Sequence, residues 1–192
     1  MGCYRFSMPD EPERPERNAE KTRSRIIEAA QRIFAEKGYS HTGLREIAGS
    51  AGVAVSLIIK HFGSKAGLYE QALTSALIAP EVFQSDRPRF GQRIVEAVSD
   101  PSEPMLAPTM IALSVGDKEA REIIERVHEE RIVGPMSEWL GTPSAAARAR
   151  AIVMLTTGYA IFTRPFDGGA AAESMQILAD SLQAIVDMSD RD

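Results

Sequence analysis

Residues 42–65 read TGLREIAGSAGVAVSLIIKHFGSK, and this stretch decides the fold. Apolar residues recur at helical spacing on both sides of Gly52: Leu44, Ile47 and Ala48 before it, and Val53, Ile58 and Phe62 after it. Because glycine lacks a Cβ and takes a left-handed conformation cheaply, Gly52 predicts a tight turn between two short helices. Helices this short are unstable alone, so they must pack as one unit, as a helix-turn-helix does. In DNA-binding versions of the motif, the second helix lies in the major groove.

The rest of the chain predicts an all-α protein. Ala, Leu, Ile, Glu and Arg are prominent, and few segments alternate β-branched residues as strands do. The 192 residues can bury a sizeable core, as one domain or two small ones. No apolar run is long enough for a transmembrane helix, so we expect no membrane partner. Cys3 is the only cysteine, which excludes an intrachain disulfide and fits a reducing, cytoplasmic location.

Charge is distributed unevenly along the chain, although the formal net charge is −5. Residues 17–65 carry nine Lys or Arg and four Asp or Glu, a balance of +5. Residues 76–192 carry 11 and 18, a balance of −7. The first segment can therefore meet phosphate groups, whereas the second is expected to have a different task.

Residues 1–17 hold three prolines among charged residues and are expected to form a disordered tail. Either Met1 or Met8 can be the true start. Beyond the tail, hydrophobic periodicity and helix-breaking residues predict helices at about 19–37, 42–51, 53–62, 64–79, 87–98, 103–115, 117–140, 143–163 and 170–188. Thr42, Ser64 and Asp117 are expected to cap the helices that follow them, and Gly38 is expected to end the first. Gly134-Pro135 predicts a kink or break within 117–140.

Residues 22–73 resemble the DNA-binding domain of the TetR family of transcriptional regulators. The resemblance is carried by the run around Ile26–Phe34, Glu36-Lys37-Gly38-Tyr39, Thr42, Leu44-Arg45-Glu46-Ile47-Ala48, Ala51-Gly52-Val53 and His61-Phe62-Gly63-Ser64-Lys65 with Leu68-Tyr69. It implies a three-helix DNA-binding head at 18–66, a linking helix at 64–79 and a ligand-binding, dimerising body at 80–192, about nine helices in all. The body more loosely resembles one actinobacterial-type group of TetR C-terminal domains. The family also implies a two-fold dimer on a palindromic operator.

Mapped through the family motif, the DNA contacts fall on the second helix of the motif and its flanks. Val55, Ser56 and Leu57 are in base-reaching positions, while Ile59, Lys60 and His61, with Thr42 and Lys65, lie nearer the DNA backbone. The common Ser-Lys-Gly-Thr-Leu-Tyr pattern is replaced here by residues 54–59, AVSLII, which loses two hydroxyl donors. Val55 and Leu57 could contact thymine methyl groups instead, and DNA shape could supply specificity. Alternatively, Leu57 and Ile59 are packing residues of a helix that does not bind DNA.

In the body, the resemblance implies an effector site between helices, and such sites are mostly apolar with a few polar groups. Candidate lining residues, many of them expected to be ordinary core, are Met105, Met110, Val127, His128, Met136, Trp139, Thr156, Tyr159 and Phe162. The resemblance places the dimer interface on the last two helices, whose apolar stripes contain Ile152, Leu155, Gly158, Met175, Leu178, Leu182 and Ile185. These stripes could also pack only within one subunit.

The sequence contains no phosphate-cradling glycine loop and no nucleophile motif, so no enzymatic activity and no cofactor are expected. His41, His61 and His128 are too scattered to predict a metal site. We therefore expect a ligand-responsive DNA-binding regulator, most simply a repressor released from its operator by a small hydrophobic effector. The alternative is an interaction module or an activator with weakened sequence-specific DNA binding. Effector, operator and regulated genes cannot be derived from these residues.

Overall fold

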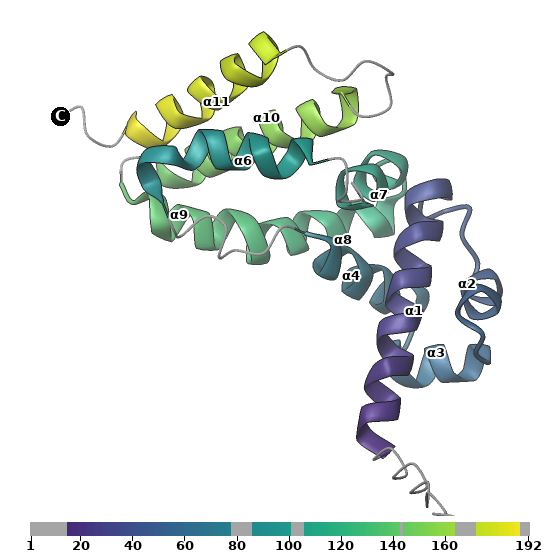
Figure 1. The fold of residues 1–192 in the computed structure, drawn as a ribbon. Helices are drawn as coiled ribbons and strands as arrows, with labels where there is room; N and C mark the ends of the chain where they lie inside the picture. The colour runs from purple at the N-terminus through teal and green to yellow at the C-terminus, as the bar shows by residue number, and fades with distance from the viewer. Residues whose placement is uncertain (1–14, 78–85, 101–105, 143, 164–171, 189–192) are drawn as a thin grey trace, which may run out of the picture.

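The computed structural model describes residues 15–77, 86–100, 106–142, 144–163 and 172–188. Every regular element in these ranges is a helix (Figure 1). If η1 is counted with α6, and the uninterrupted run from Lys118 to Leu140 as one helix, the described ranges hold nine helices, as expected. The all-α prediction is confirmed.

The first four helices are α1 (Pro15–Lys37), α2 (Leu44–Ala51), α3 (Val55–Phe62) and α4 (Lys65–Ala76). Helix α1 begins four residues before the expected Ala19 and ends where expected, since Gly38 follows with φ of +71°. The amide of Gly38 donates to the carbonyl of Phe34 at 2.9 Å, which closes the last turn. The expected tail at 1–17 lies mostly outside the described residues.

One hydrophobic core joins α1–α4 to α7 (Leu106–Ser114) and α8 (Lys118–His128). Its fully buried side chains include Ile26, Phe34, Ile47, Ile58, Leu68, Tyr69 and Met110. Phe34, Tyr39 and Tyr69 pack as a ring cluster with centroid separations of 4.9–6.1 Å. Helices α7 and α8, expected in the body, thus share a core with the DNA-binding head.

A second core lies among α6 (Phe90–Ser99), α9 (Gly134–Leu140), α10 (Ala145–Thr163) and α11 (Ala172–Asp187), at the opposite end of the molecule from α3 (Figure 1). The 3-10 turn η1 (Arg87–Arg89) leads into α6. Contact between α6 and α11 is close because Gly91 has no side chain. A Cβ at Gly91 would lie 2.0 Å from the carbonyl oxygen of Ala179.

The helix continues through Gly134-Pro135 without a break. In place of the expected kink or break, the turn just before these residues is widened. Residues Glu129–Val133 form a π-helical turn, η2, between α8 and α9. The amide of Gly134 donates to the carbonyl of Glu129, five residues earlier. Pro135 has no N–H, and its ring crowds the carbonyl four residues back, so a widened turn relieves the conflict that a regular α-helix would have.

Candidate nucleic-acid interface and internal cavity

The turn between α2 and α3 has the geometry predicted from Gly52. This residue has φ of +64° and ψ of +41°, and the amide of Val53 donates to the carbonyl of Ala48 at 2.9 Å. From α1, the guanidinium of Arg25 donates to the carbonyl of Ala51. Helix α1 therefore braces the corner that orients α3.

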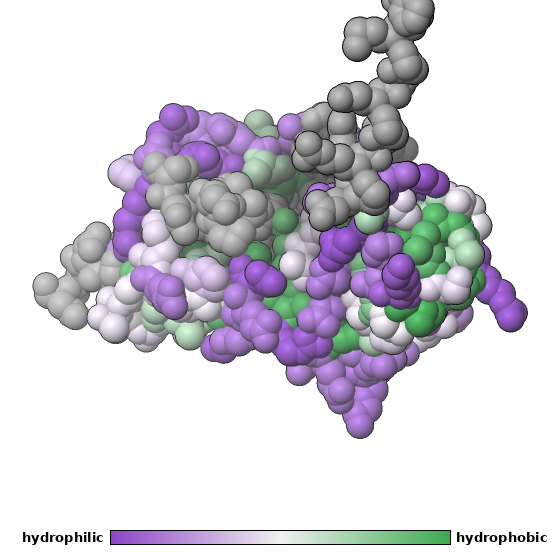
Figure 2. Space-filling model, turned by 90° about the horizontal axis from the view of Figure 1, so that it is seen from below, coloured by the Kyte–Doolittle hydropathy of each residue, from purple (hydrophilic) through white to green (hydrophobic). Residues whose placement is uncertain are grey.

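Helix α3 has one face in the core and one face toward solvent. Ile58 and Phe62 are buried, and Val55 packs partly against the same core. The outward face carries Ser56, Leu57, Ile59, Lys60 and His61, with Ile59 43% exposed. Figure 2 looks at this end of the molecule and shows hydrophobic surface over the α2–α3 region, with hydrophilic surface around it. The outward face of α3 thus carries both polar and apolar side chains.

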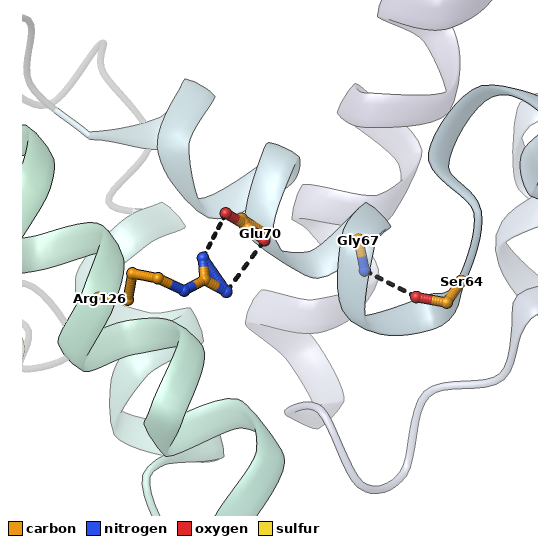
Figure 3. Close-up of polar contacts among 4 residues, drawn as sticks. All are labelled: Ser64, Gly67, Glu70 and Arg126. Carbon is orange, nitrogen blue, oxygen red and sulfur yellow. Dashed lines mark hydrogen bonds and ion pairs between the residues drawn. The ribbon is translucent and has the colours of Figure 1, made fainter.

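The joint between α3 and α4 is held by short-range contacts (Figure 3). The Ser64 hydroxyl accepts a hydrogen bond from the Gly67 amide at 3.0 Å, so the predicted cap of this helix is confirmed. Gly67 also touches the end of α3, because a Cβ there would lie 2.2 Å from the carbonyl oxygen of Phe62. The absence of a side chain at Gly67 therefore fixes how α3 sits on α4.

Two exposed cations belong to the α2–α3 motif. Lys60 is exposed on α3, which carries no acidic residue. Arg45 is exposed in the first turn of α2, where a cation opposes the helix dipole. Neither residue forms an ion pair with another described residue. Arg45 was not among the predicted contacts. Its place at a helix start, where a cation is unfavourable for the helix, is the sequence signal that could have found it.

Two predicted DNA contacts, Thr42 and Lys65, are placed elsewhere by the structure. Thr42 does not cap α2, because Gly43 holds that position. Its side chain is only 3% exposed, and its hydroxyl donates to the carbonyl of Gly38 at 2.7 Å. Thr42 thus closes the turn after α1, and its hydroxyl proton is already used.

Lys65 is half-buried, with Nζ 4.2 Å from the centre of the Tyr39 ring. Burial lowers the pKa of Lys65, and the carboxylates of Asp117 and Glu119 act in the opposite direction. The ammonium group therefore faces Tyr39 and the start of α8. Lys65, which is predicted to lie near the DNA backbone, thus lies at the junction between head and body.

That junction is built around the turn that follows α1. The Tyr39 amide donates to Ser114 Oγ at 3.0 Å, and its hydroxyl bonds to a carboxylate oxygen of Glu119. The Ser40 hydroxyl donates to Asp117, whose other carboxylate oxygen accepts from the Ala120 amide and caps α8 as predicted. These bonds tie the head to the α7–α8 turn.

A second tie joins α4 to α8. Both guanidinium nitrogens of Arg126 reach the Glu70 carboxylate, at 2.6 and 3.1 Å, in a bidentate pair (Figure 3). Arg126 stands two residues before His128, which lines the cavity described next. The ion pair therefore connects the middle of α4 to the wall of that cavity.

A cavity of about 570 Å³ lies between the two cores. Its walls come from α4, α6, α7, α8 with η2, α9 and α10, and most of the lining side chains are apolar. The last residues of α4 and the one after it, Ser75, Ala76 and Leu77, form part of the wall. A volume of this size suits a small organic molecule.

Of the nine predicted pocket residues, His128, Met136 and Thr156 line the cavity. Met110 and Val127 are instead buried in the first core, and Trp139 packs on Phe90 and under Arg87. The other three predicted residues do not line the cavity in the described ranges. The Tyr159 hydroxyl lies 3.2 Å from Ser99 Oγ, Phe162 is 71% exposed, and Met105 lies outside the described residues. Helical periodicity identifies an apolar stripe, but it cannot separate residues that fill a core from those that border a hollow.

The polar groups of the cavity wall are few. Burial lowers the pKa of His128, so its imidazole is neutral near pH 7. The Thr156 hydroxyl bonds to the carbonyls of Ile152 and Val153, and Gln31 donates to the carbonyl of Ala72 at 3.1 Å. A neutral imidazole can offer a bound molecule a hydrogen bond without adding a charge. Ser75, Asp100 and Thr157 are further polar residues of this wall.

The predicted dimer stripes divide between the inside and the outside of the subunit. Ile152, Leu178 and Leu182 are buried in the second core, and Met175 and Ile185 pack against it, so these five do not face outward. Leu155 is exposed, and open space surrounds Gly158. The exposed apolar residues of α10 and α11 are Met154, Leu155, Phe162 and Ile177. Of the predicted interface residues, Leu155 thus belongs to this exposed set, whereas the five above pack within the subunit.

No helix in the described ranges is long and apolar enough to cross a membrane. The same ranges contain no group of three or more His, Cys, Asp or Glu residues that could hold a metal ion.

Both parts of the chain match known families. A family model described as bacterial regulatory proteins, tetR family, matches residues 26–72, and one described as tetracyclin repressor-like, C-terminal domain, matches residues 88–186. The HTH-type transcriptional regulator TtgR of Pseudomonas putida is 44% identical over 62 residues, which are 32% of this chain and 30% of TtgR. RaaS of Mycobacterium tuberculosis is 53% identical over 45 residues, or 23% of this chain and 21% of RaaS. These matches cover less than a third of the relatives' length.

Solved structures resemble the chain over more of its length. NalD, described as the secondary repressor of the MexAB-OprM multidrug efflux pump in Pseudomonas aeruginosa, superimposes with a TM-score of 0.62 at 26% identity, covering 86% of this chain and 97% of NalD. A tetR family regulator from Shewanella sp. PV-4 gives 0.64 at 16% identity over 84% of this chain and 95% of its own, which shows the fold alone.

Proposed function

Since the chain belongs to the TetR family of DNA-binding transcriptional regulators, we propose that it is a repressor that binds a palindromic operator as a dimer. A small hydrophobic effector in the cavity would release it from that operator. The DNA contacts would come from Ser56, Leu57, Ile59 and Lys60 of α3, with Arg45 at the start of α2.

Helix α4 is the observation that carries the effector response. Its first turn is locked to the end of α3 through Ser64 and Gly67, and its last residues line the cavity. Arg126 holds the middle of α4 to α8. A molecule that moves the cavity walls therefore acts on the same rigid helix that sets the position of α3. The coupling requires that the effector bind one of the two arrangements more tightly than the other.

The dimer would form through α10 and α11. Helix α10 has apolar residues on more than one side. One side packs in the second core, while Met154, Leu155 and Phe162 remain exposed on the other. A second copy of the chain would bury these residues and place two α3 helices about 34–36 Å apart, one helical turn of DNA.

Repression rather than activation is supported by NalD, which is a repressor and superimposes over most of the chain. FasR of Mycolicibacterium smegmatis, an activator, is 38% identical over 50 residues, which are 26% of this chain and 23% of FasR. The apolar face of α3 favours a second candidate, an interaction module that has kept the head fold without sequence-specific binding.

Footprinting on the DNA upstream of the chain's own gene, at low salt, separates these candidates. We expect a protected palindrome, and Lys60→Ala should weaken binding to all sequences. It should also reduce the salt slope by about 1 for each phosphate that the lysine no longer neutralises. Lys118→Ala is the matched control, because Lys118 is an exposed lysine on α8 of the body. Absence of any protected palindrome would leave the interaction module as the better account.

The effector is tested on the same operator with a panel of hydrophobic small molecules. Ala160→Phe fills part of the cavity, since Ala160 is buried in its wall, and should abolish release by any active compound. Ala147→Phe, on an exposed position of α10, should leave release intact. Equal release from both variants would show that the effector binds elsewhere.

A further inference from the structure

The outward face of α3 offers little hydrogen bonding for a helix that has to read bases. Ser56 supplies one hydroxyl at its centre, and Lys60 and His61 lie toward its C-terminal end. The other outward side chains are Leu57 and Ile59, and neither is part of the two cores or packed against them. Val55, which the sequence placed among the base-reaching residues, packs partly into the head instead.

The positions of Leu57 and Ile59 on the helix are informative. At 100° per residue, Leu57 falls on one side of the line from Ser56 to Lys60 and Ile59 on the other. The face thus has a narrow polar centre with an apolar side chain on each flank. Lys60 gives this face a positive charge, and α3 carries no acidic residue. Such a surface complements an anionic partner that presents apolar groups in a groove.

The major groove of DNA presents one apolar group, the 5-methyl of thymine. We propose that α3 recognises its half-site mainly through thymine methyl groups, with Leu57 and Ile59 each packed against at least one of them. Because the two side chains flank the helix, the thymines they contact lie on opposite strands. This inference rests on the proposed function, in which α3 enters the major groove. Ser56 and Lys60 would then set register through one base-edge or phosphate contact each.

Removal of a single thymine methyl group should weaken DNA binding by a predictable factor. Burial of one methyl-sized group corresponds to about a fourfold change in affinity. In a symmetric operator with two half-sites, removal of the same methyl from both gives about 15-fold. Hydrogen-bond readout by Ser56 and Lys60 alone would make binding insensitive to the methyl groups.

The test uses the full chain and an operator already defined by footprinting, so that failure to bind DNA at all is recognised first and counts against the proposed function only. Each thymine of the half-site is then replaced by deoxyuridine, one at a time on either strand, in both half-sites together. We expect at least one sensitive position on each strand, with about 15-fold weaker binding. Thymines outside the footprint serve as the control.

A double-mutant cycle assigns each methyl group to a side chain. Leu57→Ala should weaken binding to the thymine operator, and at one sensitive position it should bind thymine and deoxyuridine equally. Ile59→Ala should do the same at a position on the other strand. Ser56→Ala is the matched control on the same face and should keep the full response to methyl removal. Leu57 and Ile59 lie outside both cores, so neither substitution should lower the melting temperature much. An unchanged melting temperature then shows that the fold of each variant is intact.

Operator binding that is insensitive to every deoxyuridine replacement would overturn the inference. So would a loss of affinity that stays equally large in Leu57→Ala and Ile59→Ala, because the methyl effect would then arise from DNA shape. If both variants bind the operator as the natural chain does, the apolar flanks serve a protein partner and not a base sequence.

Discussion

The two hydrophobic cores differ in how completely side chains fill them. The core of α1–α4 is filled by aromatic rings, with Phe34, Tyr39 and Tyr69 in mutual contact. The core of α6 and α9–α11 borders a cavity of about 570 Å³, and five of its buried residues, Ile94, Val98, Ile132, Met136 and Ile152, line that cavity. Of the buried apolar residues of the first core, Ala107 lines it. A filled core holds one shape, whereas a core with a hollow can adjust around a guest. This difference supports the proposal that one end recognises DNA and the other a small molecule.

The strongest challenge to this comparison is a large-to-small substitution in each core. Phe34→Ala should cost about 3–5 kcal/mol of unfolding free energy, because the ring is fully buried among other rings. Met136→Ala should cost about 2 kcal/mol, at the low end for such changes, since one side of Met136 already faces the cavity. Denaturant unfolding with unchanged m-values measures both. Equal losses would mean that the two cores are equally well filled.

A smaller effect is expected at the joint between α3 and α4. Gly67→Ala places a methyl group against the carbonyl of Phe62, and crowding of this kind costs about 1–3 kcal/mol. DNA affinity should fall as well, because α3 must tilt to make room. Gly49→Ala on α2 is the matched control, since no atom lies within 4 Å of its added Cβ. It should be neutral or slightly stabilising, by up to about 1 kcal/mol. A Gly67→Ala protein with normal DNA affinity would show that the joint does not set the angle of α3.

The smallest expected effect is on the pH dependence of stability, through His128 in the wall of the cavity. The folded pKa of His128 lies below its ordinary value because of burial, so the unfolded chain takes up the proton first. The stability associated with neutral His128 is therefore present above about pH 6.5 and is lost as the pH falls through the folded pKa. His128→Gln should flatten the fall in melting temperature between about pH 7 and 5. Identical curves for His128→Gln and the natural chain would refute the assignment.

Local signals in the sequence predicted the helix ends well. Gly38, Gly52, Ser64 and Asp117 are placed by backbone chemistry that acts over three or four residues, and the structure confirms all four. The prediction that Thr42 caps α2 was wrong, and the reason is again local. A threonine can cap the next helix or bond to the carbonyl four residues back, and tertiary packing chose the second here.

Contacts between distant segments could not be predicted in the same way. The direction of Lys65 depends on Tyr39, and on Asp117 and Glu119 from a helix that begins far along the chain. Five of the residues predicted for the dimer interface on α10 and α11 pack within the subunit, which is the alternative that the sequence left open. Periodicity cannot show which of two apolar faces a subunit covers by itself.

The π-helical turn at Glu129–Val133 has a consequence for the pattern along residues 118–140. Buried positions recur every three or four residues at Ala120, Ile123, Ile124 and Val127, and again from Ile132 to Met136 and Leu140. The one step between these sets, from Val127 to Ile132, is five residues. The two halves of this long helix are therefore out of phase by one residue, and the wide turn absorbs the slip. One continuous rod can thereby present its apolar side first to the filled core and then to the hollow one.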